Sequence, residues 1–268
     1  MKYKRNINKI LNNTIWITGC ARSGTTILGK ILSTLKSVEY AFEPEYLYTL
    51  LPKIHSFDKR NWLNLYNTYL IEELFFNLCN GRKINLRKID ESYIGHSLSS
   101  KDLKAKLKIN ISRIDFENFL KKNEKNLVIK IPNISRNLVA LEKYYPKNKF
   151  IITVRNGKLI SNSIIKKKWF QNNNNLPLIY KNPDLFGKNI NKKWLKLNEK
   201  EKTEEYIKQV NKSCKKLKNK HVFVYENLIK DPDKEINKIC KFLNLKKTIK
   251  TKEVIKTVKR IGHSNWLK

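Results

Sequence analysis

The chain has 268 residues, of which 57 are Lys or Arg and 23 are Asp or Glu, so its formal charge is +34. This balance excludes an acidic or neutral surface. A hydrophobic share of 40% with 10% aromatic residues is enough for a folded core, which excludes a purely disordered basic chain. Because 48 of the 57 cations are Lys, AT-rich codon usage would produce the same excess, and the charge alone is weak evidence for a nucleic-acid partner.

Strand and helix patterns alternate along the chain. Strands are expected at 14–18, 38–42, 127–131, 150–154 and 222–224, with helical patterns after Gly24, over about 135–145 and after Asp231. This alternation predicts an α/β fold of the P-loop type, in which a central parallel sheet of about five strands is flanked by helices in three layers. We expect one domain over 1–268, with a helical insertion around 46–120, a surface excursion at 171–191 and a C-terminal tail at 246–268.

Cysteine spacing and hydropathy bear on the compartment. Four cysteines lie far apart without Cys-x-x-Cys spacing, which predicts neither a zinc site nor a disulfide framework. No apolar run approaches the roughly 18 residues of a membrane span, and residues 1–13 lack the apolar segment of a secretory signal. We therefore expect a cytoplasmic protein without a transmembrane segment.

A glycine-rich loop, Gly19 to Thr26 (GCARSGTT), joins the first strand to the first helix. It fits the Walker A pattern except that Thr25 replaces the lysine. Glycines let backbone N–H groups point inward at an anion, and the helix N-terminus adds roughly half a positive charge. Without the lysine a γ-phosphate is poorly stabilised, whereas Arg22 suits a single 5′-phosphate. The loop therefore predicts a nucleotide ligand that does not undergo γ-phosphoryl transfer; the alternative is an ordinary tight turn.

Residues 19–32 resemble the 5′-phosphosulfate loop of sulfotransferases that use 3′-phosphoadenosine 5′-phosphosulfate (PAPS), particularly the carbohydrate and protein-tyrosine branches. Further likenesses follow in family order over about 14–245. They are the Lys-x-Pro strand at 127–132, the 3′-phosphate motif from Arg155 to Ser163, and the YE-x-L, Pro and Phe-Leu elements at 224–243. Residues 260–266 faintly resemble the C-terminal loop of cytosolic members, although the lysine of that loop is absent here.

The resemblance implies PAPS as donor and adenosine 3′,5′-bisphosphate as product, without a metal. The 5′-phosphosulfate would be held by Arg22, Ser23, Gly24, Thr25 and Thr26. Arg155 and Ser163 would hold the 3′-phosphate, and Arg260 and Gly262 would close over the nucleotide.

Two residues are candidate catalysts. Glu43 ends the second strand, at the sheet edge where open α/β folds place ligands, and by resemblance it is the general base. Glu45 is a competing candidate, and helix capping is the alternative role for Glu43. Lys130 sits in an apolar strand, where an unpaired ammonium would cost several kcal/mol, so we expect an anionic partner. By resemblance that partner is the sulfuryl group or the bridging oxygen; a structural ion pair is the alternative.

The sequence therefore predicts a sulfotransferase acting on a hydroxyl of a carbohydrate or small metabolite. A glycan is one candidate acceptor, and no nucleic-acid partner is expected. Acceptor specificity should lie in the insertion and the loop around 170–195. A P-loop kinase is the second enzymatic hypothesis, against which the missing lysine argues. A non-catalytic basic protein that binds polyanions would explain the charge but not the ordered motifs.

Overall fold

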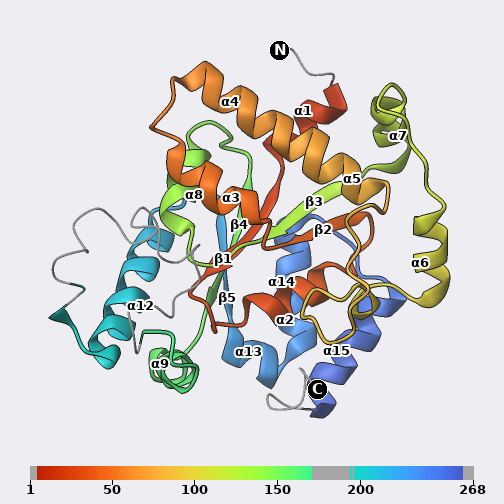
Figure 1. The fold of residues 1–268 in the computed structure, drawn as a ribbon. Coiled ribbons are helices and arrows are strands. Elements are labelled where there is room, and N and C mark those ends of the chain that lie inside the picture. The colour runs from red at the N-terminus through yellow and green to blue at the C-terminus, as the bar shows by residue number, and fades with distance from the viewer. Residues whose placement is uncertain (1–4, 171–193, 195, 262–268) are drawn as a thin grey trace.

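A five-stranded parallel sheet runs through the middle of the computed structural model, which describes residues 5–170, 194 and 196–261 (Figure 1). The strand order is β2-β3-β1-β4-β5, and every neighbouring pair is parallel. The predicted α/β fold with about five parallel strands is confirmed. The strands are β1 (Ile15–Gly19), β2 (Val38–Phe42), β3 (Asn126–Lys130), β4 (Lys149–Val154) and β5 (Lys220–Val224).

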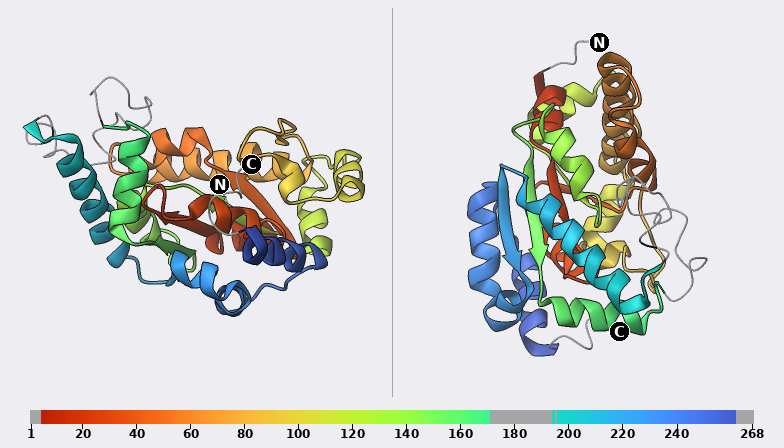
Figure 2. Two further views of the ribbon diagram at one scale, coloured as in Figure 1. Left: turned by 90° about the horizontal axis from the view of Figure 1, so that it is seen from below. Right: turned by 90° about the vertical axis from the view of Figure 1, so that its left-hand side faces the viewer.

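Helices cover both faces of the sheet, as the two views of Figure 2 show. One face carries α2 (Thr25–Leu32), α13 (Tyr225–Lys230), α14 (Pro232–Leu243) and α15 (Ile249–Ile261). The other face carries α1 (Arg5–Asn12), α3 (Glu45–Leu50), α4 (Lys59–Thr68), α5 (Phe76–Cys79), α7 (Phe116–Asn123), α8 (Ser135–Glu142), α9 (Gly157–Lys166) and α12 (Glu199–Lys215), with the 3₁₀ turn η1 (Leu51–Lys53) and the π-helix η2 (Tyr69–Phe75). Helix α6 (Ser100–Leu107) and the 3₁₀ turn η3 (Ile94–His96) complete the insertion.

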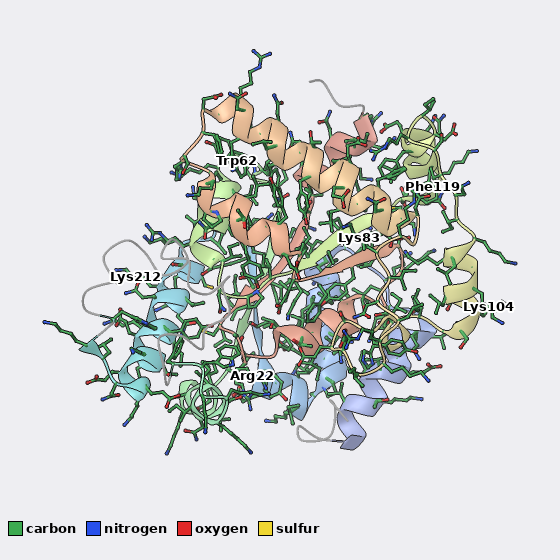
Figure 3. The ribbon with its side chains drawn as sticks, viewed as in Figure 1. Arg22, Trp62, Lys83, Lys104, Phe119 and Lys212 are labelled. Atoms are coloured by element: carbon green, nitrogen blue, oxygen red, sulfur yellow. The ribbon has the colours of Figure 1, made fainter. Side chains whose placement is uncertain are left out.

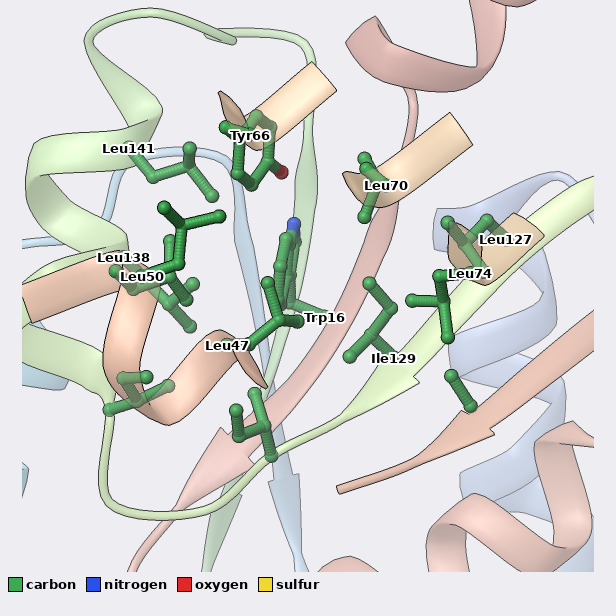
Figure 4. Close-up of a cluster of buried hydrophobic side chains, with 14 of the residues drawn as sticks. Trp16, Leu47, Leu50, Tyr66, Leu70, Leu74, Leu127, Ile129, Leu138 and Leu141 are labelled. Carbon is green, nitrogen blue, oxygen red and sulfur yellow. The ribbon is translucent and has the colours of Figure 1, made fainter. Parts of the chain in front are cut away.

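The core is divided by the sheet into two clusters, because successive side chains of a strand point to opposite faces. Ile15 and Ile17 pack toward α2 and α14, whereas Trp16 packs toward α3, α4 and α8. Figure 4 shows the Trp16 ring among Leu47, Tyr66 and Ile129. Trp16 and Ile17 are fully buried, which is why this strand is apolar on both faces, and each such side chain contributes about 1.5–3 kcal/mol.

The C-terminal segment of the chain is helical as far as the structure describes it. Asp231 accepts a hydrogen bond from the Lys234 amide and Pro232 opens α14, as the sequence predicts. The segment expected as a tail at 246–268 contains α15, whose Val254, Ile255 and Val258 are buried against the sheet layer. Residues 171–191, expected as a surface excursion, lie outside the described residues. Among the described helices, none combines the length and apolar composition needed to cross a bilayer.

Candidate active site

The loop between β1 and α2 depends on two glycines. Gly19 has φ 138° and Gly24 has φ 99°, in the region that favours glycine. A Cβ on Gly19 would come 2.5 Å from the Thr153 carbonyl oxygen, and one on Gly24 would come 2.5 Å from the Tyr225 ring. Both the backbone conformation and the close approach of β4 and α13 therefore require glycine at these positions.

Side chains outside the loop fix its shape. The Ser23 hydroxyl donates to the Cys20 carbonyl at 2.5 Å and lies 2.5 Å from Thr153 Oγ1. The Ser23 amide also donates to the Cys20 carbonyl, at 3.2 Å. Asn133, which follows β3 with φ 67°, accepts a hydrogen bond from the Ala21 amide at 3.1 Å and another from the Tyr206 hydroxyl. Ser23 thus belongs to the loop framework here, and its contact with a donor stays a prediction.

Both predicted anion-binding groups lie together beside α9. Arg22 Nε donates to Ser163 Oγ at 3.0 Å, and Arg155 Nη1 donates to the Arg22 carbonyl at 3.1 Å (Figure 3 labels Arg22). The Arg155 guanidinium lies 4.7 Å from the centre of the Tyr225 ring. Glu226 next to it accepts from the Asn156 amide at 2.9 Å. The residues at 22, 155 and 163 therefore form one basic, hydroxyl-bearing group at the carboxyl ends of β1 and β4.

The two threonines of the loop begin α2. Thr25 is buried, and the Leu28 amide closes the first turn by donating to the Gly24 carbonyl at 3.1 Å. The Thr26 hydroxyl donates to Glu91 Oε2 at 3.2 Å. Glu91 was not a candidate from the sequence, because nothing in its local pattern marks it and it lies 65 residues from Thr26.

Glu43 and Lys130 meet where β2 and β3 end. The Glu43 amide donates to the Lys130 carbonyl at 2.8 Å, and Lys130 Nζ donates to Glu43 Oε1. The Lys130 side chain is 2% exposed and its ammonium lies 4.1 Å from the centre of the Phe42 ring. Glu43 has φ 43°, a strained conformation for a non-glycine residue of the kind that gathers at functional sites. Lys130 thus has an anionic partner in Glu43, the ion pair named above as its alternative role, and its contact with a sulfuryl group or bridging oxygen stays a prediction.

Burial lowers the pKa of Lys130, while the adjacent Glu43 carboxylate opposes that shift. Glu91 also raises this pKa, and Arg22 lowers it further. The loop follows β1, while Glu43 follows β2 and Lys130 ends β3, and these three strands are parallel neighbours. The loop and the ion pair therefore lie at the same edge of the sheet.

Glu43 also forms part of the wall of a pocket of about 800 Å³, a size typical of small-molecule sites. The pocket lies between β2, α2, the η2–α5 segment and residues 82–98. Glu45, the competing base, is the first residue of α3 and lines the same pocket. Lys130 contacts Glu43, so the two candidate acids differ in their place relative to the buried cation.

The remaining predicted site residues lie at the C-terminal end. Arg260 falls in the last turn of α15, and Gly262 lies outside the described residues. Their closing contact over a nucleotide stays a prediction. Sequence reasoning missed Asn133, Tyr206 and Glu91, of which only Asn133 carried a signal, since it directly follows the Lys-x-Pro strand and precedes a helix.

Comparison with known proteins defines the class of this enzyme. The model of the sulfotransferase family matches residues 14–248, so the chain belongs to that family and is an enzyme that transfers sulfuryl groups. The comparison with curated protein sequences gives no match.

Solved structures with the same fold include the sulfotransferase domain from the curacin biosynthetic pathway, with TM-score 0.50 and 19% identity over 89% of this chain and 76% of that chain. The sulfotransferase domain from the Synechococcus PCC 7002 olefin synthase has TM-score 0.48 and 17% identity over 90% of this chain and 76% of that chain. Sulfotransferase STF1 from Mycobacterium tuberculosis H37Rv has TM-score 0.44 and 15% identity over 94% and 73%. At 19% identity the first of these supports the fold and nothing finer.

Proposed function

We propose that this sulfotransferase moves a sulfuryl group from PAPS to a hydroxyl of a carbohydrate or small-metabolite acceptor, with Glu43 as general base. One observation carries the proposal. The Glu43 carboxylate contacts the buried Lys130 on one side, Lys130 ends the strand that pairs with β1 just before the phosphate loop, and Glu43 also lines the pocket. A base placed between an anion-binding loop and an open pocket suits transfer from a nucleotide to an acceptor.

The residues at the loop fit the donor. Glycine at position 24 permits the positive φ and the close approach of the Tyr225 ring that the loop needs, and the N-terminus of α2 favours negative charge there. Arg22, Arg155 and Ser163 add charge-assisted hydrogen bonding within reach of one another. These groups would hold the 5′-phosphosulfate and the 3′-phosphate of one nucleotide.

When bound, PAPS supplies the sulfuryl group: the acceptor oxygen bonds to sulfur as the bond from sulfur to the bridging phosphate oxygen breaks, which yields a sulfate ester and adenosine 3′,5′-bisphosphate. Glu43 takes the proton of the attacking hydroxyl. Lys130 turns from Glu43 toward the negative charge that develops on the leaving oxygen. The ion pair between Lys130 and Glu43 thereby holds both groups in place until the substrates separate them.

The proposed donor is tested by titrating the protein with adenosine 3′,5′-bisphosphate and with ATP. Micromolar binding of the bisphosphate in preference to ATP is the expected result. Preference for ATP would favour the kinase hypothesis. The sequence argues against that hypothesis, because Thr25 occupies the position of the Walker A lysine. Indifference to both would favour a protein that binds polyanions through its surface charge.

A cytoplasmic location belongs to the same proposal. Cys20, Cys79, Cys214 and Cys240 are all free and buried, which is typical of chains in a reducing compartment. Burial raises the pKa of the Cys214 thiol to about 11, so it is protonated and unreactive at neutral pH.

A further inference from the structure

Helix α12 contacts the loop between β1 and α2, the loop proposed to hold the donor, at two consecutive residues. The Cys20 thiol lies 3.9 Å from the Ile207 carbonyl oxygen. The Ala21 amide donates to the Tyr206 hydroxyl oxygen at 2.7 Å. One turn of α12 thus supports the loop directly before Arg22, from a place in the chain that is 185 residues away from Ala21.

The Tyr206 side chain is fixed on all sides and is 2% exposed. Its hydroxyl donates to Asn133 Oδ1 while its oxygen accepts from the Ala21 amide. The centre of its ring lies 5.9 Å from that of Phe170, which in turn lies 5.2 Å from that of Trp194. Because the ring is packed and the hydroxyl acts as both donor and acceptor, Tyr206 holds the Ala21 amide in one direction.

The residue after this contact has an unusual backbone conformation. Arg22 has φ 68°, in the left-handed region that a non-glycine residue keeps only where its surroundings fix it. On one side Tyr206 holds the preceding amide, and on the other side the Arg22 carbonyl accepts from Arg155 Nη1 at 3.1 Å. In this conformation the Arg22 side chain reaches Ser163. The contacts of α12 and of the end of β4 therefore maintain the conformation of Arg22 together.

The amides of the loop divide into two groups. Those of Ala21 and Ser23 donate to acceptors within the protein. The Leu28 amide closes the first turn of α2, so the amides that begin this helix, Thr25 and Thr26 among them, have no acceptor within the helix. The loop therefore offers an anion the amides of the helix start and uses the earlier ones to keep its own shape.

From these contacts we propose that Tyr206 is a positioning residue for the donor. By holding the Ala21 amide inward, it keeps Arg22 in the conformation in which this residue meets the 5′-phosphosulfate. The inference rests on the proposed function and adds to the donor site a residue that lies outside the loop. Tyr206 acts through Ala21 and Arg22, so its removal should weaken binding at the 5′ end of the nucleotide.

The variant Tyr206→Phe tests this role. It keeps the packed ring and leaves the Ala21 amide the Asn133 oxygen at 3.1 Å, so the variant should fold. Calorimetric affinity for adenosine 3′,5′-bisphosphate should fall by about 3–10-fold, the effect of one neutral hydrogen bond. Adenosine 3′-phosphate, which lacks the 5′ group, should lose no more than about twofold in a competition titration. A general loss of structure would weaken both nucleotides alike.

The matched control is Tyr145→Phe. The hydroxyl of the buried Tyr145 also donates to an asparagine oxygen, that of Asn67, but it lies near the amino end of β4, at the opposite edge of the sheet from the loop. This variant should lose a comparable free energy of unfolding in urea and no nucleotide affinity. The inference is wrong if Tyr206→Phe binds the bisphosphate as the unaltered enzyme does, weakens both nucleotides equally, or is matched by the control.

Hydrogen exchange gives a second test that needs no variant. In the unaltered enzyme the Ala21 amide should resist exchange without nucleotide and should not slow further when the bisphosphate binds, whereas the Thr25 and Thr26 amides should slow. Slowing of Ala21 as strong as that of Thr25 would show that this amide turns to the ligand, which would overturn the inference. Failure of the unaltered enzyme to bind the bisphosphate is a separate outcome, since it overturns the donor assignment itself.

Discussion

The proposed donor side and the proposed acceptor side of this active site are built in different ways. The donor side consists of consecutive residues, 19–26, set at the end of β1 and completed by Arg155 at the end of β4. The pocket proposed for the acceptor takes its lining from β2, α2, α3, the η2–α5 segment, residues 82–98 and α6, which are far apart in the chain. A parallel sheet brings the ends of its strands together automatically, whereas the pocket depends on how the insertion packs.

This difference separates a site that needs a particular local sequence from one that does not. A nucleotide held by backbone amides requires particular glycines and a helix N-terminus, so its site has a recognisable local sequence. A pocket lined by loops and by the η2–α5 segment, in which a π-helix continues as an α-helix, tolerates many substitutions of its lining residues without loss of the fold. Each of the following variants tests whether the two sides are separable in function.

The largest effect is expected for Glu43→Gln, at the junction of the two sides. Glutamine still accepts a hydrogen bond from Lys130 but cannot take a proton, so kcat should fall by about 10²–10⁴. Binding of adenosine 3′,5′-bisphosphate should be unchanged, as measured by calorimetry. The matched control is Glu45→Gln, which should change kcat only a few-fold. A comparable loss in the control would transfer the role of base to Glu45.

Arg155→Ala should act on the donor side alone. Loss of a charge-assisted contact to the 3′-phosphate should weaken the bisphosphate by about 10–100-fold, since such hydrogen bonds contribute about 1.5–3 kcal/mol. Adenosine 5′-phosphate, which lacks the 3′ group, should lose far less affinity in the same titration. Arg136→Ala on the exposed side of α8 is the control. Equal weakening of both nucleotides would show that Arg155 supports the loop through the Arg22 carbonyl and not the 3′-phosphate.

Asn133→Gly tests the framework behind the donor loop. Glycine tolerates φ 67° but removes the oxygen that accepts from the Ala21 amide and from the buried Tyr206 hydroxyl. The amide keeps the Tyr206 oxygen as an acceptor at 2.7 Å, whereas the Tyr206 hydroxyl loses this acceptor. We expect the free energy of unfolding to fall by about 1–3 kcal/mol in urea denaturation, with weaker bisphosphate binding. Asn244 at the end of α14 has φ 58° and an exposed side chain, so Asn244→Gly should be neutral or stabilising. Equal stability of the two variants would remove Asn133 from the framework.

The sheet and the donor loop were predictable because their signals are local. Each strand is a short apolar run, and β2 spans the predicted residues 38–42 while β5 begins two residues before the predicted 222. The glycines and threonines of the loop lie within eight positions of one another, so their pattern predicts both the turn and the start of the helix that follows it.

The acceptor side was not predictable in the same detail. The contact of Thr26 with Glu91 and the pairing of Glu39 with Lys106 join residues about 65 positions apart, and no periodicity specifies them. The sequence predicts a basic tail where α15 lies, because the lysines of this helix outnumber the buried Val254, Ile255 and Val258 that pack it on α2 and α14. The charged surface residues of α15 thus made its amphipathic pattern hard to recognise in the sequence.

The smallest effect on nucleotide binding is expected for Glu91→Gln. This variant also tests most directly whether the donor side and the acceptor side act separately, because Glu91 contacts both. Its carboxylate lines the acceptor pocket and accepts the Thr26 hydroxyl hydrogen that the donor would need. Removing its charge should tighten bisphosphate binding by about 2–10-fold, and this gain should shrink as salt is raised. Asp90→Asn, one residue earlier in the same loop, should leave the affinity unchanged. Weaker binding by Glu91→Gln would mean that the carboxylate positions Thr26 for the donor, so that the acceptor wall helps to build the donor site.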